Sequence, residues 1–319
     1  MNHAAPYTML HEVEMDVHTV LTVGFFDGVH RGHRTVLERV LAEAKRNDAR
    51  ALMVTFDRPP RSVLHGVSVP LLTTLREKAS IVRDLGLTDT VVIPFDQAFA
   101  QLDAAEFVRS ILVERIGLTR IVLGYDHRFG RGGTGTVDTM RTLGRAHGFD
   151  VQIVPAQKED GEAYSSTRIR ELLTNEGDVA EAAALLGRNY RIRGGVVHGD
   201  GRGRTIGFPT ANLQLLDSDK VVPATGVYAV FTRIRGDRSW RSGIMNLGYR
   251  PTVTDAVDLV AEVHLLDFQG DLYGLEAEVA FVRRIRSEKR FDGVESLVRQ
   301  IRRDLEHCKE ILESVSLPD

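Results

Sequence analysis

Two histidines stand three residues apart in the segment GFFDGVHRGH, which runs from Gly24 to His33. Imidazole nitrogens can donate hydrogen bonds to phosphate oxygens, and these bonds strengthen when charge builds up in a transition state. Gly28 and Gly32 let the backbone approach a ligand closely, and a helix that begins here offers free N–H groups to an anion. His30 and His33 therefore favour a loop that handles phosphate.

Two other interpretations of these histidines stay open. A zinc site needs about three or four protein ligands, and no nearby cysteine or second histidine pair completes such a set. The segment could also be a polar connection between a strand and a helix, with both imidazoles in water. The phosphate interpretation uses more of the local residues than either alternative.

A second candidate anion site lies in YSSTRIRELL, residues 164–173, where hydroxyl side chains including Ser166 and Thr167 precede Arg168 and Arg170. An ordinary Ser/Thr N-cap would explain the hydroxyls alone. Hydroxyls, a helix N-terminus and two guanidinium groups together also bind anions. The two segments could therefore hold a triphosphate from both sides.

The second half of the chain contains a glycine- and arginine-rich loop that runs into PTAN, in VVHGDGRGRTIGFPTANL at residues 196–213. The glycines permit unusual backbone angles and close approach to phosphate. Thr210 and Asn212 offer neutral oxygens that suit Mg²⁺. A flexible hairpin loop would explain the glycines alone, but the attached PTAN stretch favours a nucleotide site.

Glu262 is the candidate general base of the second half. In LVAEVHLLDF, residues 259–268, apolar side chains alternate with Glu262 and His264, so Glu262 projects away from the core if this segment is a strand. It could accept a proton from an attacking hydroxyl, as a positioned carboxylate does in kinases. Taken alone, a glutamate on a strand is far more often simply solvated.

The first half alternates between expected strands and expected helices. Short apolar runs predict the strands TVLTVGFF, ALMVTF, TDTVVIPF, RIVLGYD and DVQIVPA. Helical spacing predicts a helix through Val36 and Ala44, and further helices in LREKASIVRDLG, DAAEFVRSILVERIG and VDTMRTLGRAHG. This order predicts a parallel sheet covered on both faces, with ligands at the carboxyl ends of strands, where the two histidines lie.

From about Arg188 the pattern changes to short strands joined by Gly, Asp and Asn. In residues 275–281 we expect Leu275, Ala277, Val279 and Phe281 to face the core of a half-buried antiparallel strand. The tail VESLVRQIRRDLEHCKEILES returns to helical spacing. The second half is thus predicted to be a small antiparallel β-barrel with a closing helix, and STRIRELLTNEGDVAEAAALLG forms one or two connecting helices.

The composition fits a globular protein of about two domains, with 319 residues, of which 43% are hydrophobic and 27% charged. A formal charge of −3 does not imply a large nucleic-acid surface. The single cysteine, Cys308, excludes an intrachain disulfide and fits a reducing cytoplasm. We see no signal peptide and no apolar run of about 18 residues, so no membrane span is expected.

Several motifs carry a family resemblance. HRGH and SSTRIR resemble the two signatures of the nucleotidyltransferase superfamily, and VGFFDGVHRGH, VLGYDHRFGRGGTG and YSSTRIRELL together resemble the adenylyltransferase module of bacterial bifunctional riboflavin kinase/FAD synthetases. The PTAN loop, NLGYRPTV and IRSEKRF are similar to the riboflavin kinase module. The resemblance runs from about Thr19 to Asp304. It implies a Rossmann-like adenylyltransferase domain over residues 1–186 and a kinase domain over 187–319.

The resemblance implies that ATP phosphorylates riboflavin to FMN and that a second ATP adenylylates FMN to FAD. It implies Mg²⁺ as the metal cofactor, and neither a nucleic acid nor a membrane as a partner. The implied catalytic residues are His30, His33 and Glu262. Implied adenylyltransferase ligands are Gly24, Phe26, Asp27, Gly28, Asp126, Ser166, Thr167 and Arg170. Implied kinase ligands are Gly201, Gly203, Arg204, Gly207, Pro209, Asn246 and Arg286, with Thr210 and Asn212 on Mg²⁺.

The chain departs from the family pattern in two places. Arg58 stands where the family tends to have the histidine of a Pro-His-Pro stretch, and His127 stands where a phenylalanine is usual. The alternatives to the bifunctional enzyme are an adenylyltransferase for another phosphorylated acceptor and a flavin- or nucleotide-binding regulatory protein. The regulatory protein would bind flavin tightly without turnover.

Overall fold

The computed structural model describes residues 5–16, 18–87, 89–156, 158–159, 162–199, 201–251 and 257–318. The chain divides into two compact units, Met1–Ser166 and Thr167–Asp319. The predicted domain boundary after residue 186 stays a prediction. Among the described residues, no helix is both long enough and apolar enough to cross a membrane.

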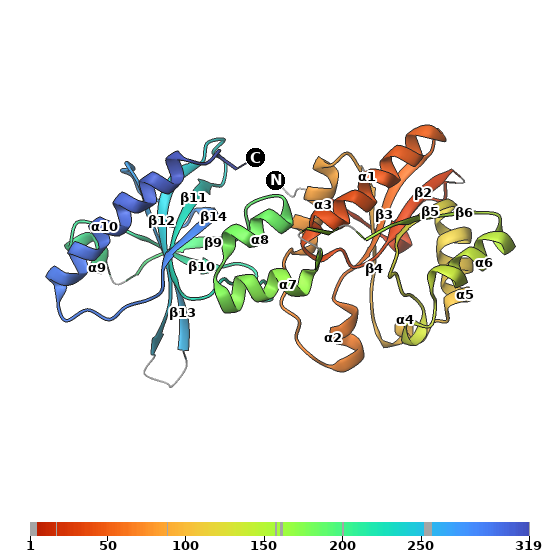
Figure 1. Ribbon diagram of the computed structural model, residues 1–319, viewed down its shortest axis with the longest axis horizontal. Helices are drawn as coiled ribbons and strands as arrows, with labels where there is room; N and C mark the ends of the chain where they lie inside the picture. The colour runs from red at the N-terminus through yellow and green to blue at the C-terminus, as the bar shows by residue number, and fades with distance from the viewer. Residues whose placement is uncertain are drawn as a thin grey trace. The chain divides into compact units, whose positions relative to one another are not determined.

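The first unit contains a parallel sheet, as predicted, and its six strands lie in the order β1-β4-β3-β2-β5-β6 (Figure 1). The strands are β1 (Thr8–Met9), β2 (Thr19–Val23), β3 (Arg50–Phe56), β4 (Asp89–Ile93), β5 (Leu118–Gly124) and β6 (Asp150–Val154). A separate pair, β7 (Lys158–Glu159) and β8 (Glu162–Ala163), is antiparallel. The strands of the large sheet read as apolar runs because helices cover the sheet on both sides.

The helices of the first unit cover the two faces of this sheet. They are η1 (Leu10–Glu12), η2 (Asp27–Val29), α1 (Arg31–Arg46), α2 (Pro60–His65), α3 (Leu75–Asp84), α4 (Gln97–Ala100), α5 (Ala104–Glu106), η3 (Phe107–Ile116), η4 (Arg131–Gly133) and α6 (Val137–His147). On one face Val20 and Met53 pack with Leu37 of α1. On the other face Leu21 packs with Leu112 of η3. Neighbours along a strand point to opposite faces, so each strand supplies both cores.

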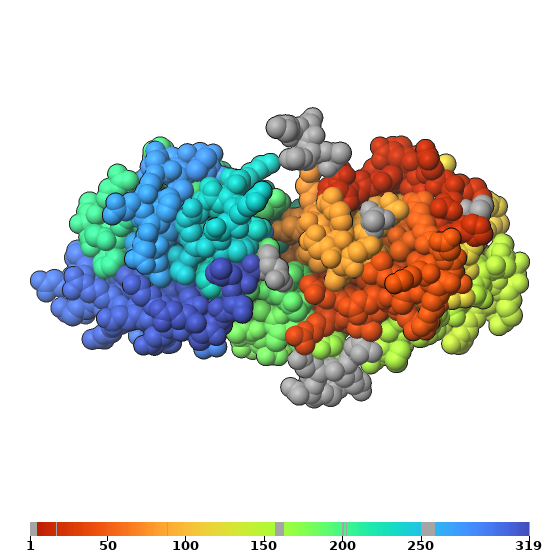
Figure 2. All heavy atoms as spheres, turned by 90° about the horizontal axis from the view of Figure 1, so that it is seen from above, coloured from red at the N-terminus to blue at the C-terminus, as the bar shows by residue number. Residues whose placement is uncertain are grey.

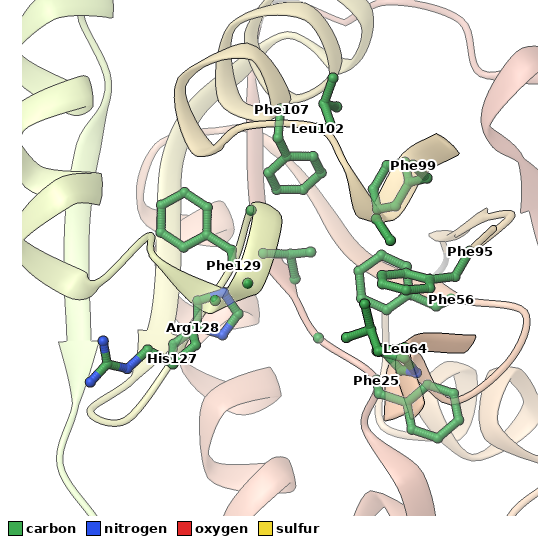
Figure 3. A pocket seen from close by; sticks show the side chains of 17 residues that line it. Phe25, Phe56, Leu64, Phe95, Phe99, Leu102, Phe107, His127, Arg128 and Phe129 are labelled. Carbon is green, nitrogen blue, oxygen red and sulfur yellow. The ribbon is translucent and has the colours of Figure 1, made fainter. Parts of the chain in front are cut away.

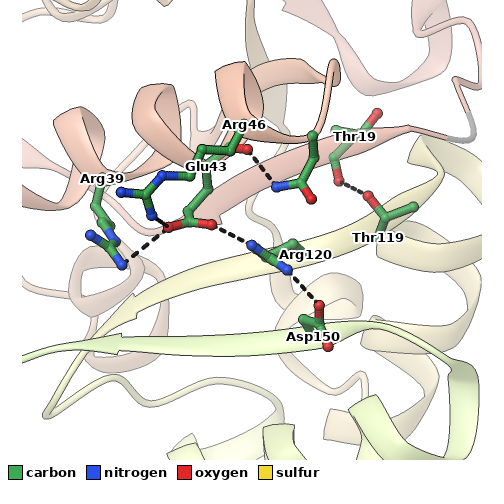
Figure 4. A network of polar contacts seen from close by, with 8 residues as sticks. Thr19, Arg39, Glu43, Arg46, Thr119, Arg120 and Asp150 are labelled. Carbon is green, nitrogen blue, oxygen red and sulfur yellow. Dashed lines mark hydrogen bonds and ion pairs between the residues drawn. The ribbon is translucent and has the colours of Figure 1, made fainter.

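A buried carboxylate fixes α1 on the sheet (Figure 4). Glu43 is 3% exposed and accepts hydrogen bonds from Arg46, at 2.9 Å, and from Arg120 of β5. Arg39 lies 3.1 Å from the same carboxylate, and Arg120 also bonds Asp150 of β6 at 2.7 Å. A buried charge is tolerated only when it is well paired, as Glu43 is. The network therefore sets the direction of α1, whose first turn carries His33.

The second unit is an antiparallel barrel, as predicted, and its strands close in the order β10-β13-β12-β11-β14-β9. Its strands are β9 (Arg191–Val197), β10 (Ala211–Leu215), β11 (Gly226–Ile234), β12 (Arg241–Pro251), β13 (Val257–Leu265) and β14 (Glu276–Arg286). Its helices are α7 (Ser166–Glu171), η5 (Leu172–Glu176), α8 (Val179–Leu186), α9 (Arg202–Thr205) and α10 (Val294–Glu313).

The closing helix α10 covers one side of the barrel, and the dark-blue atoms of the C-terminal segment run along the lower edge of the second unit in Figure 2. Cys308 and Ile311 of this helix pack on Ala280 and Val282 of β14. The predicted alternation in this strand is therefore right only in part. Ala277, Val279 and Phe281 are buried, but Ala280 is buried too because α10 covers it, and Leu275, expected to face the core, is 43% exposed before the strand begins.

Candidate functional sites

The loop after β2 makes an unusual turn at the carboxyl end of the sheet. Phe26 and Val29 have positive φ angles of 50° and 41°, and Gly28 has φ 81°. Non-glycine residues rarely adopt this region, and when they do the surrounding contacts must hold them there. The turn leads directly into α1, so it sets where His30 and His33 lie.

Asp27 ties this turn to the segment before α3. Its buried carboxylate accepts hydrogen bonds from the backbone N–H groups of Leu72, at 3.0 Å, and Thr73, at 3.0 Å. The Thr73 hydroxyl in turn accepts from the N–H of Gly28 at 3.0 Å. Asp27 thus has a structural role in the turn. The ligand-binding roles predicted for Asp27 and Gly28 stay predictions.

Lys78 of α3 also contacts the loop that follows β2. Its Nζ donates to the carbonyl oxygen of Phe25 at 2.5 Å and to the Thr55 hydroxyl at 3.2 Å. Burial lowers the pKa of Lys78 to about 8, and the charge of Asp27 opposes that shift. Sequence reasoning missed this residue. The available signal was a lysine within the apolar stripe of the predicted helix, four residues before Val82.

His30 and His33 lie together at the N-terminus of α1. Their rings stack with centroids 3.5 Å apart and planes 17° apart, and His30 is 5% exposed. His30 is the N-cap: its Nδ1 accepts a hydrogen bond from the His33 N–H at 3.3 Å. In the neutral ring this bond places the proton on Nε2, which can act as a donor. Phe26 packs edge-on against His33 with centroids 5.1 Å apart.

Ser166 joins this site from far along the chain. Its hydroxyl donates to the carbonyl oxygen of Asp27 at 2.9 Å, which brings the predicted serine to the histidine loop. Thr167 and Arg170 follow in α7 and belong to the second unit. Their predicted part in the phosphate site stays a prediction.

A cavity of about 280 Å³ opens beside this loop, with aromatic walls (Figure 3). It lies where several strands end: Gly24 follows β2, Phe56 ends β3, and Phe95 follows β4. Phe129 and His127 form the wall that faces Phe56 and Phe95 in the close-up view. The sequence did not reveal this cavity, because its walls come from segments spread over about a hundred residues. Of the predicted ligands, Gly24 lines the cavity, and Asp126 is exposed.

In the second unit three predicted residues form one row across the barrel wall. The register pairs Glu262 of β13 with Asn246 of β12 on one side and with Asn212 of β10 on the other. Side chains of directly paired residues lie side by side on the same face. All three are half-buried, whereas Ala261 and Val263 beside Glu262 are buried, so Glu262 points away from the core as predicted.

The PTAN loop borders a second cavity, of about 520 Å³. Predicted residues Arg204, Pro209 and Thr210 line this cavity, as do Val263 and Tyr273. The predicted Gly201 and Gly207 have φ angles of 68° and 88°, which agrees with their expected unusual backbone. A Cβ on Gly203 would overlap the Phe208 carbonyl oxygen, so that predicted glycine permits a close backbone approach.

The last predicted kinase ligand, Arg286, lies at the end of β14 and is held by α10. Its guanidinium bonds the buried Asp304 carboxylate at 2.8 Å and lies over the Phe291 ring, 5.8 Å from the centroid. This contact fixes the segment IRSEKRF beside the barrel. The predicted NLGYRPTV stretch is described as far as Pro251, and its last two residues lie outside the described residues.

Comparison with known proteins matches each half of the chain to a protein family. A FAD synthetase family model matches residues 12–168, and a riboflavin kinase family model matches residues 186–312. A bifunctional riboflavin kinase/FMN adenylyltransferase of Listeria monocytogenes is 38% identical over 291 residues, which are 91% of each chain. The Escherichia coli K12 protein of the same name is 39% identical over 286 residues, covering 89% of this chain and 90% of the relative.

One solved structure also matches nearly the whole chain. It is described as a macrolide-efflux protein from Streptococcus pneumoniae, with 32% identity and a TM-score of 0.87, and the match covers 94% of this chain and 96% of that one. The similarity in fold therefore extends over both units.

Proposed function

The chain belongs to the family of bifunctional riboflavin kinase/FMN adenylyltransferases, and from this premise we propose that it makes FMN and then FAD, with the roles of its residues as follows. The second unit transfers the γ-phosphoryl group of ATP to riboflavin. The first unit joins FMN to the adenylyl group of a second ATP. The observation that carries the assignment of the first unit is the stacked pair His30 and His33 at the start of α1.

Adenylyl transfer needs no protein nucleophile, because the phosphate of FMN already carries an anionic oxygen. This oxygen attacks the α-phosphorus of ATP, the bond to the β-phosphate oxygen breaks, and pyrophosphate leaves. Negative charge grows on the α-phosphate in the transition state, where hydrogen-bond donors at fixed positions stabilise it. His30 Nε2, the His33 imidazole and the N–H groups at the start of α1 are the proposed donors.

We place the flavin ring of FMN in the aromatic cavity of the first unit. Its phenylalanine walls can stack on a flat, fused ring. Gly24 lines the cavity and also begins the histidine segment, so a ring bound there leaves the FMN phosphate near the start of α1. The predicted ligands Phe26, Asp27, Asp126 and Ser166 of the first unit keep their proposed roles in binding ATP and FMN, and Thr167 and Arg170 stay predicted ligands.

In the kinase reaction we assign Glu262 as the general base. It takes the proton from the ribityl 5′-hydroxyl of riboflavin as the oxygen attacks the γ-phosphorus of ATP. The row that Glu262 forms with Asn212 and Asn246 supports this role, since both amides can orient groups beside the carboxylate. The glycine- and arginine-rich loop would hold the ATP phosphates.

Thr210 and Asn212 are the proposed protein ligands of Mg²⁺. Their neutral oxygens fit this ion, which takes few protein ligands and otherwise binds water and phosphate oxygens. Within the described residues, no group of three or more His, Cys, Asp or Glu side chains is placed to hold a metal ion. When bound, Mg²⁺ would offset the charge of the transferred phosphoryl group. We also propose a cytoplasmic location, where ATP is available and Cys308 stays reduced.

The test is a time course of the purified protein with riboflavin, ATP and Mg²⁺, in which chromatography resolves riboflavin, FMN and FAD. FMN should rise first and FAD should follow. FMN without FAD would contradict the assignment of the first unit and turn attention to an acceptor other than FMN. Bound flavin without any product would instead support the regulatory protein.

A further inference from the structure

We propose that His127 is a specificity residue of the adenylyltransferase site, whose imidazole forms a hydrogen bond with the polar edge of the flavin ring. The proposal rests on the function given above, in which the aromatic cavity holds that ring. It concerns a position where this chain has a histidine and the family resemblance leads us to expect a phenylalanine.

The Nε2 atom of His127 is buried and has no hydrogen-bond partner among the described residues. Buried polar atoms in native proteins are almost always hydrogen-bonded, so each exception calls for an explanation. The imidazole belongs to the lining of the aromatic cavity, beside Phe129 (Figure 3). A rotation of the imidazole about its Cβ–Cγ bond would turn Nε2 toward a ligand in the cavity, which can then supply the partner that the protein lacks.

The chemistry of the imidazole matches that of a flavin. Burial lowers the pKa of His127 to about 4, although the charge of Asp126 opposes the shift, so the ring is neutral at physiological pH. A neutral imidazole has one N–H donor and one acceptor nitrogen. The isoalloxazine edge offers the N3–H donor and the carbonyl and N5 acceptors, so either tautomer of His127 finds a partner there.

The backbone around His127 is held firmly enough to aim the ring. Phe129 and Gly135 exchange two backbone hydrogen bonds of 3.1 and 2.9 Å, and the Arg131 N–H donates to the Leu102 carbonyl at 2.8 Å. Gly130 lies so close to α5 that a Cβ there would come within 2.7 Å of the Ala104 nitrogen. The backbone that carries His127 is therefore already fixed, so only the side chain has to turn for the hydrogen bond to form.

The imidazole itself is also oriented by its neighbours. Its ring lies roughly parallel to that of Phe129, with centroids 5.9 Å apart and planes 21° apart. The backbone N–H of His127 donates a hydrogen bond to the Gly124 carbonyl oxygen at 3.3 Å, which ties the residue to the end of β5. Most of the other side chains that line the cavity are apolar or aromatic, so a hydrogen bond from His127 would discriminate strongly among flat ligands.

The test compares His127→Phe with His127→Gln in the full-length protein, using FMN as the substrate of adenylyl transfer. Phenylalanine keeps the ring and removes both nitrogens, whereas glutamine keeps a polar atom at about the distance of Nε2. We expect His127→Phe to raise the KM for FMN about tenfold, the usual effect of one lost hydrogen bond, with kcat changed by less than about twofold. His127→Gln should recover most of the loss, and His147→Phe, at an exposed histidine of α6, should behave as wild type.

Flavin analogues keep the proposal testable if a variant fails to fold. N3-methyl-FMN lacks the donor of the ring edge and 5-deaza-FMN lacks the N5 acceptor. Wild type should bind one of these analogues about tenfold more weakly than FMN, and the group that this analogue lacks is the one that His127 contacts. If wild type binds both analogues as tightly as it binds FMN, His127 does not bond the polar edge of the ring and the inference is wrong.

Three further results would overturn the inference. The first is an unchanged KM for FMN in folded His127→Phe, and the second is a loss that His127→Gln does not recover, which would indicate packing alone. The third is a rise in the KM for ATP rather than FMN, which would place the nucleotide in the cavity. Each of these needs a wild type that makes FAD, whereas a wild type that makes only FMN would contradict the proposed function itself.

Discussion

Lys78 holds Phe25 by two contacts: its Nζ donates a hydrogen bond of 2.5 Å to the Phe25 carbonyl oxygen and lies 4.0 Å from the centroid of the Phe25 ring. Phe25 precedes the strained turn at Phe26 and lines the aromatic cavity. The buried ammonium therefore stabilises the backbone from which both the cavity wall and the histidine pair extend. It is a positioning residue, since it acts through Phe25.

Replacement of Lys78 by methionine should slow FAD formation about a hundredfold and leave FMN formation unchanged. Methionine keeps most of the apolar stem but removes the donors to Phe25 and Thr55, so the turn loses an anchor, and small misplacements in an active site cost that much. Separate assays of FAD formation from FMN and of FMN formation from riboflavin measure the two rates. Arg83→Met, at an exposed position of the same helix, is the matched control, and normal FAD formation in Lys78→Met would contradict this role.

The stability of the first unit should rise with pH between about 8 and 10.5, relative to Lys78→Met. Burial lowers the pKa of Lys78 from 10.5 to about 8, so in this range the unfolded chain binds the proton that the folded chain has released. Stability then increases by at most about 1.4 kcal/mol per pH unit, and below pH 8 the difference between the proteins is constant.

Urea unfolding at several pH values measures this difference. Trp240, the only tryptophan of the chain, reports on the second unit by fluorescence. A transition seen by circular dichroism but not by Trp240 therefore belongs to the first unit. If the difference in unfolding free energy between the two proteins stays constant from pH 8 to 10.5, Lys78 keeps its ordinary pKa.

His30→Ala should reduce FAD formation by about a hundredfold or more while FMN formation continues. The change removes a proposed phosphate donor and also the N-cap of α1, whose loss costs about 1 kcal/mol of stability. His30→Asn separates the two effects, because asparagine is a good N-cap without an imidazole. If His30→Asn forms FAD at the wild-type rate, the cap alone matters and the imidazole has no catalytic role.

Glu262→Gln should lower FMN formation by about 10²- to 10⁴-fold, the usual contribution of a general base, and leave FAD formation from supplied FMN intact. Glutamine has nearly the same shape, so the row with Asn212 and Asn246 is kept while the base is lost. Product analysis with riboflavin and then with FMN gives both rates. Glu306→Gln, on the exposed side of α10, should change neither rate. Loss of both activities in folded Glu262→Gln would show that the two sites are not separate.

The sequence by itself determined the class of both units and most of the candidate residues. The alternation of apolar runs with helical spacing predicted the parallel sheet, since each element must bury its own apolar face. The same local logic put Glu262 on the side of β13 away from the buried Ala261 and Val263, and this is what the structure has.

Only the tertiary structure decided which distant residues meet. The row of Asn212, Glu262 and Asn246 depends on the register of three strands, which pairing across the barrel fixes and no local pattern encodes. Lys78 and His127 carry polar groups whose burial comes from packing by segments far away in the chain, so their lowered pKa values could not be anticipated from their own neighbours in sequence. The periodicity of the sequence predicts which way a side chain faces, whereas the groups around that side chain depend on how the whole chain packs.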